Sequence, residues 1–392
     1  MSQQLISRSP DLKRLRDEGY NVTIQANHLV VADVPYVNEH GEVRMGALIS
    51  TLSLAGDVAA RPSDHVVSFR GDYPCDASAQ KLTGLVNSTG HRNLGGGLEA
   101  QFTFSRKPTG GYVDYFHKMT TYVALLSGPA EMVDSSVTAK TFAVVDSDDD
   151  SPFVYLDTAT SRAGIGAMSD RLAGHKVGFA GIGGTGAYIL DLVAKTPVVE
   201  IHIWDGDTFD QHNAFRAPGA ASVGELAQRF NKATYFAEVY SAMHRQVTAH
   251  PENLDSDNAD QLADCDFVFV CMGDGRERKV VVDTLVEAEV PFIDVGIGVY
   301  EVAGRLAGSI RVTTSTPDAT DHLDQRLPYS NDDDGGDYAT NIQIADLNAL
   351  NAALAVIRWK KHLGFYNDLE AEHHCVYDID GNHVVNDERR AP

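Results

Sequence analysis

The spacing of apolar and polar residues divides the chain into two parts. In the first part, short runs alternate between apolar and polar positions, which is typical of strands that bury one face. The clearest of these runs are 22–25, 28–32, 65–70 and 100–105. Glycine-containing turns separate the runs, and residues 114–126 have a more helical spacing. The pattern predicts a first domain of the α+β class over residues 1–155.

After about residue 160, apolar runs alternate with helical segments. Strands are predicted at 176–181, 199–204, 266–272 and 291–295, and helices at 187–194, 232–245 and 276–288. The run 266–272 is almost continuously apolar, as expected of a strand buried on both faces. Strands that alternate with helices form mostly parallel sheets with right-handed crossovers. The second domain, residues 160–392, is therefore predicted to be of the α/β class.

A long amphipathic helix is expected near the C-terminus. Its apolar face is predicted from a stripe that recurs at steps of three and four residues: Ile344, Leu347, Leu350, Leu354 and Ile357. The charged run 146–152 is interpreted as a surface loop or linker between the two domains.

Composition narrows the possible partners. The 392-residue chain has 55 Asp and Glu against 32 Lys and Arg, a formal net charge of −23. Such a chain is poorly suited to neutralise phosphate backbone or to bind anionic lipid, so we expect neither nucleic acid nor a membrane as a partner. Apolar stretches such as 264–272 are far shorter than the ~20 residues of a membrane helix. An N-terminus without a secretory apolar core and four scattered cysteines predict a cytoplasmic protein with free thiols.

A glycine-rich turn joins the first predicted strand of the second domain to its first helix. The glycines allow backbone amides and the helix N-terminus to approach phosphate or ribose without Cβ clashes. They are Gly181, Gly183, Gly184 and Gly186. Asp205 ends the next strand, 19 positions after Gly186, where a dinucleotide-binding fold places its ribose-binding carboxylate. The turn predicts a Rossmann-like nucleotide site but does not separate NAD from ATP.

The residues that follow favour ATP. The stretch Trp204-Asp-Gly-Asp-Thr-Phe-Asp-Gln-His-Asn-Ala-Phe-Arg216 is followed by Lys232, which opens a helix, and by Asp274 after an apolar strand. Together with the glycine turn, this order resembles the ThiF/MoeB/E1 superfamily, enzymes that adenylate the C-terminus of ubiquitin-like proteins. The resemblance covers about residues 160–300 and, more loosely, 342–362. The N-terminal half resembles an uncharacterised domain that precedes some stand-alone bacterial ThiF modules.

The resemblance implies a role for each matched residue. Asp205 would bind the ribose hydroxyls of ATP. Asn213, Arg216 and Lys232 would bind the phosphates, and Arg216 could do so with two parallel hydrogen bonds. Asp274 would hold Mg²⁺, which bridges phosphate oxygens and offsets developing charge. Taken singly, Asn213 could equally be a helix cap, Arg216 a surface ion pair and Lys232 a solvated lysine.

Asp207 and Arg162 could each have one of two roles. In the family, an acid at the position of Asp207 is usually present and shapes the loop, and direct contact with the nucleotide is the second possibility. Arg162 lies just before the second domain, where family members place an arginine that reaches the phosphates, often those of the neighbouring subunit. The alternative for Arg162 is an ordinary surface arginine.

The chain also departs from the family pattern. Many relatives bind a structural Zn²⁺ through two C-x-x-C pairs, and this sequence has no C-x-x-C. Residues 300–340, where many relatives carry a thioester-forming cysteine, contain no Cys. The reaction would therefore stop at the acyl-adenylate, or a thiol elsewhere would take the acyl group. Cys271 is expected to pack in a buried strand, and Cys75 lies in a turn with no neighbour that would lower its thiol pKa.

The resemblance implies an ATP-dependent adenylyltransferase that activates the C-terminal carboxylate of a ubiquitin-like or carrier protein and releases pyrophosphate. Mg²⁺ is the expected metal, a homodimer the expected assembly, and recruitment of a partner or substrate the expected task of the N-terminal domain. A bacterial ubiquitin-like conjugation or antiviral system is one setting for such an enzyme. Two alternatives stay open, an NAD(P)-dependent oxidoreductase and a non-catalytic module that keeps a nucleotide as a structural element.

Overall fold

A computed structural model of the protein describes residues 2–56, 58–145, 151–329 and 342–389, so most of the predicted linker 146–152 lies outside the described residues. The chain forms two compact units. The first unit is Met1–Asp150 with Tyr155–Ala163, and the second is Ser151–Val154 with Gly164–Pro392. The short segment Ser151–Val154 belongs to the second unit because its backbone pairs there. The amide of Val154 donates to the carbonyl of Met243 at 2.9 Å.

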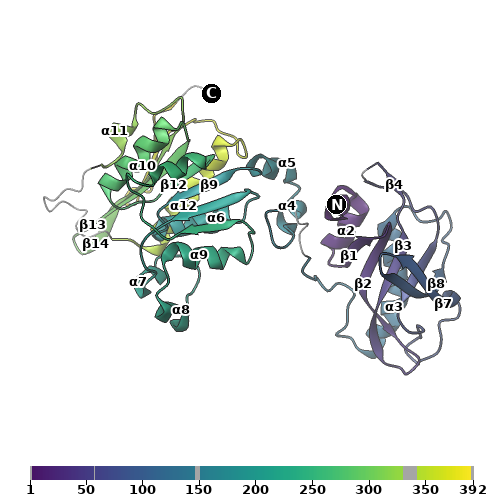
Figure 1. Ribbon diagram of the computed structural model, residues 1–392. Helices are drawn as coiled ribbons and strands as arrows, with labels where there is room; N and C mark the ends of the chain where they lie inside the picture. Colours follow the sequence, from purple (N-terminus) through teal and green to yellow (C-terminus); the bar gives the residue numbers. More distant parts are fainter. Residues whose placement is uncertain (1, 57, 146–150, 330–341, 390–392) are drawn as a thin grey trace. The chain divides into compact units, whose positions relative to one another are not determined.

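The first unit is an antiparallel sheet covered by a long helix. The strand order is β1-β2-β3-β6-β8-β7, and α3 packs on β2 and β3 (Figure 1). Its strands are β1 (Asn21–Gln25), β2 (His28–Val37), β3 (Val43–Thr51), β4 (Leu54–Ala55), β5 (Val58–Ala59), β6 (Val66–Arg70), β7 (Val86–Gly95) and β8 (Leu98–Ser105). Its helices are α1 (Ser2–Arg8), α2 (Pro10–Asp17), α3 (Tyr115–Val133) and α4 (Thr158–Ala163).

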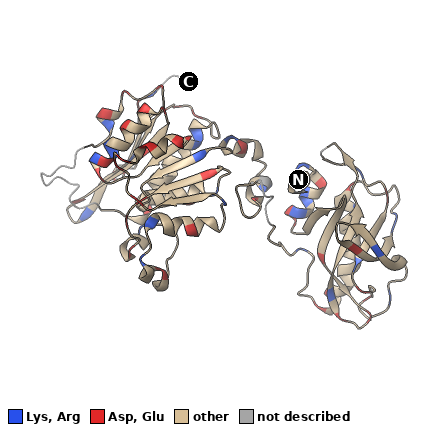
Figure 2. Cartoon of the chain, viewed as in Figure 1, with Lys and Arg blue, Asp and Glu red and all other residues tan. Residues whose placement is uncertain are grey.

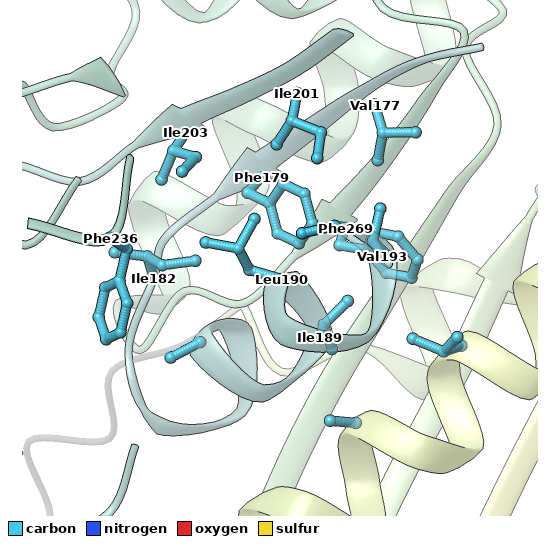
Figure 3. Packing of buried hydrophobic residues seen from close by; sticks show 14 of the residues in the cluster. Val177, Phe179, Ile182, Ile189, Leu190, Val193, Ile201, Ile203, Phe236 and Phe269 are labelled. Carbon is cyan, nitrogen blue, oxygen red and sulfur yellow. The ribbon is translucent and has the colours of Figure 1, made fainter. Parts of the chain in front are cut away.

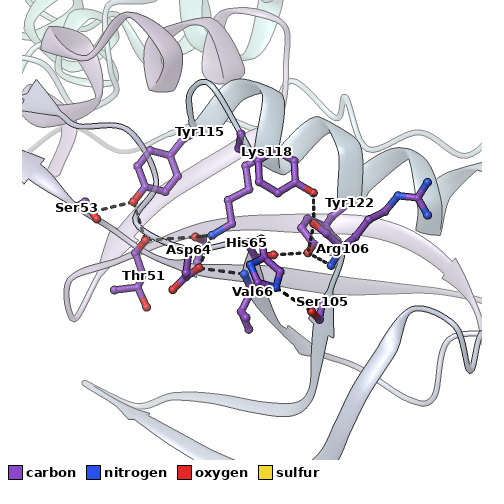
Figure 4. A network of polar contacts seen from close by, with 12 residues as sticks. Thr51, Ser53, Asp64, His65, Val66, Ser105, Arg106, Tyr115, Lys118 and Tyr122 are labelled. Atoms are coloured by element: carbon purple, nitrogen blue, oxygen red, sulfur yellow. Dashed lines mark hydrogen bonds and ion pairs between the residues drawn. The ribbon is translucent and has the colours of Figure 1, made fainter. Parts of the chain in front are cut away.

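A buried lysine ties α3 to this sheet. Lys118 is 1% exposed, and its Nζ donates to Ser50 Oγ and to Asp64 Oδ1, each at 2.9 Å. On either side of it along the helix, the hydroxyl groups of Tyr115 and Tyr122 bond to backbone groups of the sheet and its loops (Figure 4). Burial lowers the pKa of Lys118, and the carboxylate of Asp64 opposes that effect. The network fixes the helix on the sheet and has a structural role.

The second unit is a three-layer α/β structure. Its sheet has the order β11-β10-β9-β12-β13-β14-β15-β16, with the first five strands parallel and the last three antiparallel. The strands are β9 (Lys176–Ala180), β10 (Glu200–Trp204), β11 (Val247–His250), β12 (Phe267–Val270), β13 (Phe292–Val302), β14 (Arg305–Ser315), β15 (His374–Asp378) and β16 (His383–Asp387). The α/β class predicted from the sequence is confirmed.

Helices cover both faces of this sheet (Figure 1). Side chains from α6, α9 and α12 build the core on one face, and those from α10, α11 and η2 build it on the other. The helical segments are α5 (Gly166–Ser169), η1 (Asp170–Leu172), α6 (Gly184–Val193), α7 (Gln211–Ala214), α8 (Val223–Gln228), α9 (Lys232–Ser241), η2 (Ala259–Asp264), α10 (Gly275–Glu287), α11 (Leu323–Arg326) and α12 (Ala345–His362). Lys, Arg, Asp and Glu are interspersed on the elements of both units (Figure 2).

The central core explains why this sequence forms a parallel sheet. Apolar side chains of the three central strands meet those of α6 in one cluster (Figure 3). The labelled members include Val177 and Phe179 of β9, Ile201 and Ile203 of β10, Phe269 of β12, and Ile189, Leu190 and Val193 of α6. The side chains of β9 and β12 at the positions between these residues point to the other face of the sheet. These two strands are therefore buried on both faces.

Two details differ from the sequence prediction. The strand predicted at 266–272 ends at Val270, so Cys271 and Met272 belong to the turn that follows. The stripe predicted as the apolar face of α12 is partly exposed, with Leu350 at 36% and Ile357 at 41%. The buried face carries Asn348, Ala352 and Ala355 where α12 meets α6, and Trp359 in its last turns. Small residues are found at this contact because α12 packs closely on α6.

Among the described residues, none of the helices combines the length and the hydropathy of a membrane-spanning segment.

Candidate nucleotide-binding site

A cavity lies at the carboxyl ends of β9, β10 and β12. Strand β9 is the first of the parallel strands, with β10 beside it on one side and β12 on the other. The chain therefore adds β10 and β11 on one side of β9 and then β12 and β13 on its other side. Open α/β sheets bind ligands at the point where the strand order changes direction in this way. The cavity has a volume of about 320 Å³. Its lining comprises Gly181, Gly183, Trp204, Asp205, Asp207, Arg216, Lys232, Asn253, Leu254, Cys271, Met272, Gly273, Asp274, Glu277 and Gln343.

The glycine turn forms one wall of this cavity. Gly181 has a φ of +90°, and a Cβ there would lie 2.9 Å from the carbonyl oxygen of Cys271, so only glycine fits. Gly181 and Gly183 line the cavity, whereas Gly184 and Gly186 shape the turn behind it. A Cβ on Gly186 would lie 2.7 Å from the carbonyl oxygen of Gly181. The turn thus brings α6, with its N-terminus, directly to the ligand space.

Asp205 connects the glycine turn to the end of β10. Its side chain is 9% exposed; Oδ2 accepts the amide of Ile182 at 2.8 Å, and Oδ1 accepts the amide of Asp207 at 2.9 Å. Burial raises the pKa of Asp205, and the charge of Lys232 opposes that rise. Because both oxygens already hold loop amides, the carboxylate is fixed in position. Its remaining lone pairs can accept hydroxyl groups of a ribose.

Two cationic side chains converge on the cavity. Lys232 is 7% exposed, and its Nζ lies 2.6 Å from Asp207 Oδ2 and 3.7 Å from Asp205 Oδ1. Its position is set by Asn231, whose Oδ1 accepts the amide of Thr234 and so starts helix α9 at Lys232.

Arg216 supplies the second cation. Its Nε is buried and has no hydrogen-bond partner among the described residues. Burial lowers the pKa of Arg216, and the charge of Asp207 opposes that effect. A buried guanidinium nitrogen without a partner is costly, which favours an anionic ligand that would accept its hydrogen bond.

Asp274 lines the cavity from the start of α10. Its Oδ1 accepts the amides of Arg276 at 2.7 Å and of Glu277 at 3.1 Å, so the residue caps the helix. Glu277 also lines the cavity. Burial, followed by the charge of Asp274, raises the pKa of Glu277. Nothing in the sequence marks Glu277 as a site residue, because an acid in the first turn of a helix commonly interacts only with the helix dipole.

The acids of the cavity outnumber its cations. Four carboxylates line it, those of Asp205, Asp207, Asp274 and Glu277, against two cationic side chains. This excess would repel a triphosphate unless a divalent cation lay between them. Carboxylate and phosphate oxygens are the hard ligands that Mg²⁺ prefers, and it commonly takes one or two protein carboxylates. The donor set therefore fits Mg²⁺ bound together with phosphate.

Two residues predicted for the site lie elsewhere. Asn213 does not line the cavity; it is 4% exposed, and its Oδ1 accepts the amide of Asp210 in a capping box at α7. Its carbonyl accepts the amide of Arg216 at 3.0 Å, so it supports that residue. Arg162 belongs to the first unit, where its Nη2 donates to the carbonyl of Asp17 at 2.9 Å. Phosphate contacts by Asn213 and Arg162 stay predictions.

The four thiols are poorly suited to act as nucleophiles. Burial raises the pKa of Cys75, Cys271 and Cys375, and raises that of Cys265 to about 12. Cys271 is the one that reaches the cavity among the described residues, although the sequence analysis placed it within the strand as packing. A thiol with a raised pKa carries little thiolate at neutral pH.

Comparisons with known proteins match both parts of the chain. A family model described as "ThiF family" matches residues 159–357, and one described as "Domain of unknown function (DUF6791)" matches residues 10–158. No curated protein matches the sequence. Among solved structures, E. coli MccB with ATP has 18% identity over 57% of this chain and 67% of that chain, with a TM-score of 0.44. The microcin C7 biosynthetic enzyme MccB in complex with N-formylated MccA has 18% identity over 57% and 68%, with a TM-score of 0.47. Selenomethionine PaaA has 15% identity over 70% and 86%, also with a TM-score of 0.47.

Proposed function

The chain belongs to the ThiF family, and from this premise we propose that it is an adenylyltransferase that uses ATP to activate the C-terminal carboxylate of a ubiquitin-like or carrier protein. The observation that carries the proposal is the convergence of Arg216 and Lys232 on one cavity with the fixed carboxylate of Asp205. A ribose acceptor beside two cations, under a glycine turn, suits a nucleoside triphosphate.

The cations suit phosphates better than a nicotinamide dinucleotide. Lys232 is paired with Asp207, which is 67% exposed at its side chain and can turn away when a phosphate takes its place. Arg216 offers a buried N–H with no partner among the described residues. An oxidoreductase would use the glycines and Asp205 but would leave this pair of cations without a purpose. ATP is therefore the favoured nucleotide.

The proposed reaction transfers the adenylyl group to a carboxylate. A carboxylate oxygen attacks the α-phosphorus, the bond between the α-phosphorus and the bridging oxygen breaks, and pyrophosphate leaves on the opposite side. Asp205 would hold the ribose, and Arg216 and Lys232 would hold the phosphates in line for this displacement. Mg²⁺ held by Asp274 would offset the charge that develops on the leaving pyrophosphate. The product is an acyl-AMP.

The state of the thiols favours a reaction that ends at the acyl-AMP. All four cysteines have raised pKa values, and none is paired with a base in a described contact. We therefore propose that the acyl group passes to an external acceptor, which the N-terminal domain would recruit. A homodimer is the proposed assembly, supported by Leu350 and Ile357, which expose an apolar stripe of α12. Arg162 would contact either the phosphates bound to the other subunit of this dimer or those bound to its own subunit.

Exchange of radioactive pyrophosphate into ATP tests the proposal. The reaction needs a carrier protein with a free C-terminus, and the same protein with an amidated C-terminus is the negative control. We expect exchange with the free form alone. Asp274→Ala should reduce it by about 10²–10⁴, because loss of the metal ligand raises the barrier by several kcal/mol. Asp283→Ala, on the outer face of α10, is the matched control.

The same experiment separates the alternatives. Exchange that persists in Asp274→Ala but is lost in Arg216→Ala and Lys232→Ala would mean that the metal is held elsewhere. If none of the three substitutions affects exchange, the assignment of the cavity is wrong. A protein that retains ATP through purification yet exchanges no pyrophosphate with any carrier would be a non-catalytic nucleotide module.

A further inference from the structure

One polar side chain in the cavity has no task in the binding of ATP. Gln343 lines the cavity, and its Oε1 is buried without a hydrogen-bond partner among the described residues. An amide oxygen removed from water loses hydrogen bonds that nothing in the described protein replaces. Such a group indicates a ligand that brings a donor to this point.

The position of Gln343 follows from the close contact between α12 and the glycine turn. Gln343 precedes α12 by two residues, and Asn348 lies in the first turn of that helix. Asn348 Oδ1 accepts the hydroxyl of Thr185 at 3.0 Å, and its Nδ2 donates to the carbonyl of Arg216 at 3.1 Å. The start of α12 therefore touches both the glycine turn and the loop of Arg216. Gln343 lines the cavity together with Gly181, Gly183 and Arg216, so we place it on the side where the phosphates would lie.

The chemistry of the bound groups limits what Gln343 can accept. Phosphate oxygens carry no hydrogen to donate, so they cannot satisfy an amide oxygen. The ribose hydroxyls are assigned to Asp205, whose carboxylate is the stronger acceptor. The adenine amino group is also a donor, but the ribose separates it from the α-phosphorus. The donor of the two reactants that remains near the α-phosphorus is the last peptide N–H of the protein whose carboxylate is activated, because its nitrogen lies two bonds from the carboxyl carbon.

We propose that Gln343 is a positioning residue that accepts this last peptide N–H and so aligns the carboxylate with the α-phosphorus. The inference rests on the proposed adenylation and assigns the substrate class of the site as an unblocked peptide C-terminus with a secondary amide at its last residue. A C-terminus that lacks this N–H is a poor substrate. Alignment by one hydrogen bond changes the affinity for the acyl group and leaves that for the nucleotide unchanged.

The test uses two non-hydrolysable mimics of an acyl-AMP. The first is 5′-O-(N-acetylglycyl-sulfamoyl)adenosine, and in the second the amide N–H of the glycyl group is replaced by an ester oxygen. The two differ in one donor and have nearly the same shape. Isothermal titration of each, and of AMP, into the full-length protein gives three dissociation constants for every variant.

We expect the wild-type protein to bind the amide mimic about tenfold more tightly than the ester mimic, the size expected of one buried hydrogen bond. Gln343→Leu, which keeps the volume and removes the acceptor, should reduce that preference to less than threefold and leave the affinity for AMP unchanged. Gln228→Leu, an exposed glutamine of α8, is the matched control and should keep the wild-type preference.

Two results would overturn the inference. An amide preference that is equal in wild type and Gln343→Leu would mean that another group accepts the N–H. Weaker binding of AMP to Gln343→Leu, by the same factor as the amide mimic, would make Gln343 a nucleotide contact. Failure of the wild-type protein to bind any of the three adenosine compounds would instead contradict the proposed function, so the two failures are distinguishable.

Discussion

Nζ of Lys232 lies 2.6 Å from Oδ2 of Asp207. The side chain of Lys232 is buried and that of Asp207 is largely exposed. Asp207 therefore holds the ammonium group of Lys232 at the cavity and can turn away from it when a ligand binds. Such a pair keeps Lys232 in place before ATP binds, and the acid competes with phosphate for it.

Removal of this competition should strengthen binding. We expect Asp207→Asn to increase the affinity for MgATP by about three- to tenfold at low ionic strength, because one repulsive charge disappears and Lys232 loses the closer of its two acidic partners. The gain should shrink as salt is added. Titration calorimetry at two salt concentrations measures it, with Asp283→Asn as a control for net charge. Weaker binding in Asp207→Asn would mean that Asp207 contacts the nucleotide or holds Lys232 in its active position.

Cys75 provides a test of the N-terminal domain. The residue is 1% exposed, and burial raises the pKa of its thiol. We therefore expect Cys75→Ser to leave MgATP affinity and pyrophosphate exchange within twofold of wild type, and alkylation of Cys75 to be slow until the first unit unfolds. Mass spectrometry after iodoacetamide treatment follows the alkylation. A reducible adduct with a carrier protein that disappears only in Cys75→Ser would make this domain catalytic.

His374 predicts a pH dependence of stability. It is 4% exposed, and Thr313 Oγ1 lies 3.0 Å from its Nδ1. Burial, followed by the charges of Arg326 and Arg311, lowers its pKa to about 4. The unfolded chain therefore binds the proton more tightly, so stability is complete above pH 6.5 and is lost as the pH falls from about 6.5 through 4. The loss should approach ~3 kcal/mol at most.

Urea unfolding at pH 7.5 and pH 4.5 measures this loss in the second unit. Both tryptophans, Trp204 and Trp359, lie in that unit, so their fluorescence reports on it alone. His374→Gln should flatten the pH dependence, whereas His40→Gln, an exposed histidine of the first unit, should not. An unchanged slope in His374→Gln would assign the pH dependence to other groups.

The exposed stripe of α12 predicts a dimer contact. Leu350 and Ile357 are 36% and 41% exposed on a helix whose other face is buried. We expect the double variant Leu350→Lys, Ile357→Lys to be a monomer by analytical ultracentrifugation, and the wild type to be a dimer. Val223→Lys, at an exposed apolar residue of α8, is the control. A monomeric wild type at micromolar concentration would remove the proposed dimer.

The sequence was informative about the site where a motif marks the end of a parallel strand. Gly181, Asp205 and Asp274 each follow a central strand of the sheet, and parallel strands bring their carboxyl ends to one edge. Their convergence could therefore be predicted from the order of the strands, whereas the place of Lys232 is predicted from the resemblance to the ThiF/MoeB/E1 superfamily. Glu277, Asn253 and Gln343 could not be predicted, because they enter the cavity from a helix turn and two loops whose place depends on tertiary packing.

The orientation of α12 shows a different limit of sequence patterns. A stripe of leucine and isoleucine predicts a buried face, yet the helix buries Asn348, Ala352 and Ala355. The short distance between α6 and α12 explains which face is buried, since a Cβ at Gly184 of α6 would lie only 2.1 Å from Nδ2 of Asn348. A side chain in place of Gly184 would not fit there, whereas α12 buries Trp359 in its last turns. Hydrophobic periodicity indicates which side of a helix is apolar, but it does not indicate how closely a neighbouring helix packs against it.

Titration of nucleotides shows whether the cavity is an ATP site. MgATP and NAD⁺ are titrated separately into the wild-type protein, into Arg216→Ala, and into Arg229→Ala as the control, since Arg229 pairs with Asp210 at the surface. We expect wild type and Arg229→Ala to bind MgATP more tightly than NAD⁺, and Arg216→Ala to lose at least tenfold in MgATP affinity, the effect of one charge-assisted phosphate contact. Tighter binding of NAD⁺ than of MgATP by the wild type would contradict this expectation, and so would an Arg216→Ala variant that binds MgATP as well as the wild type does.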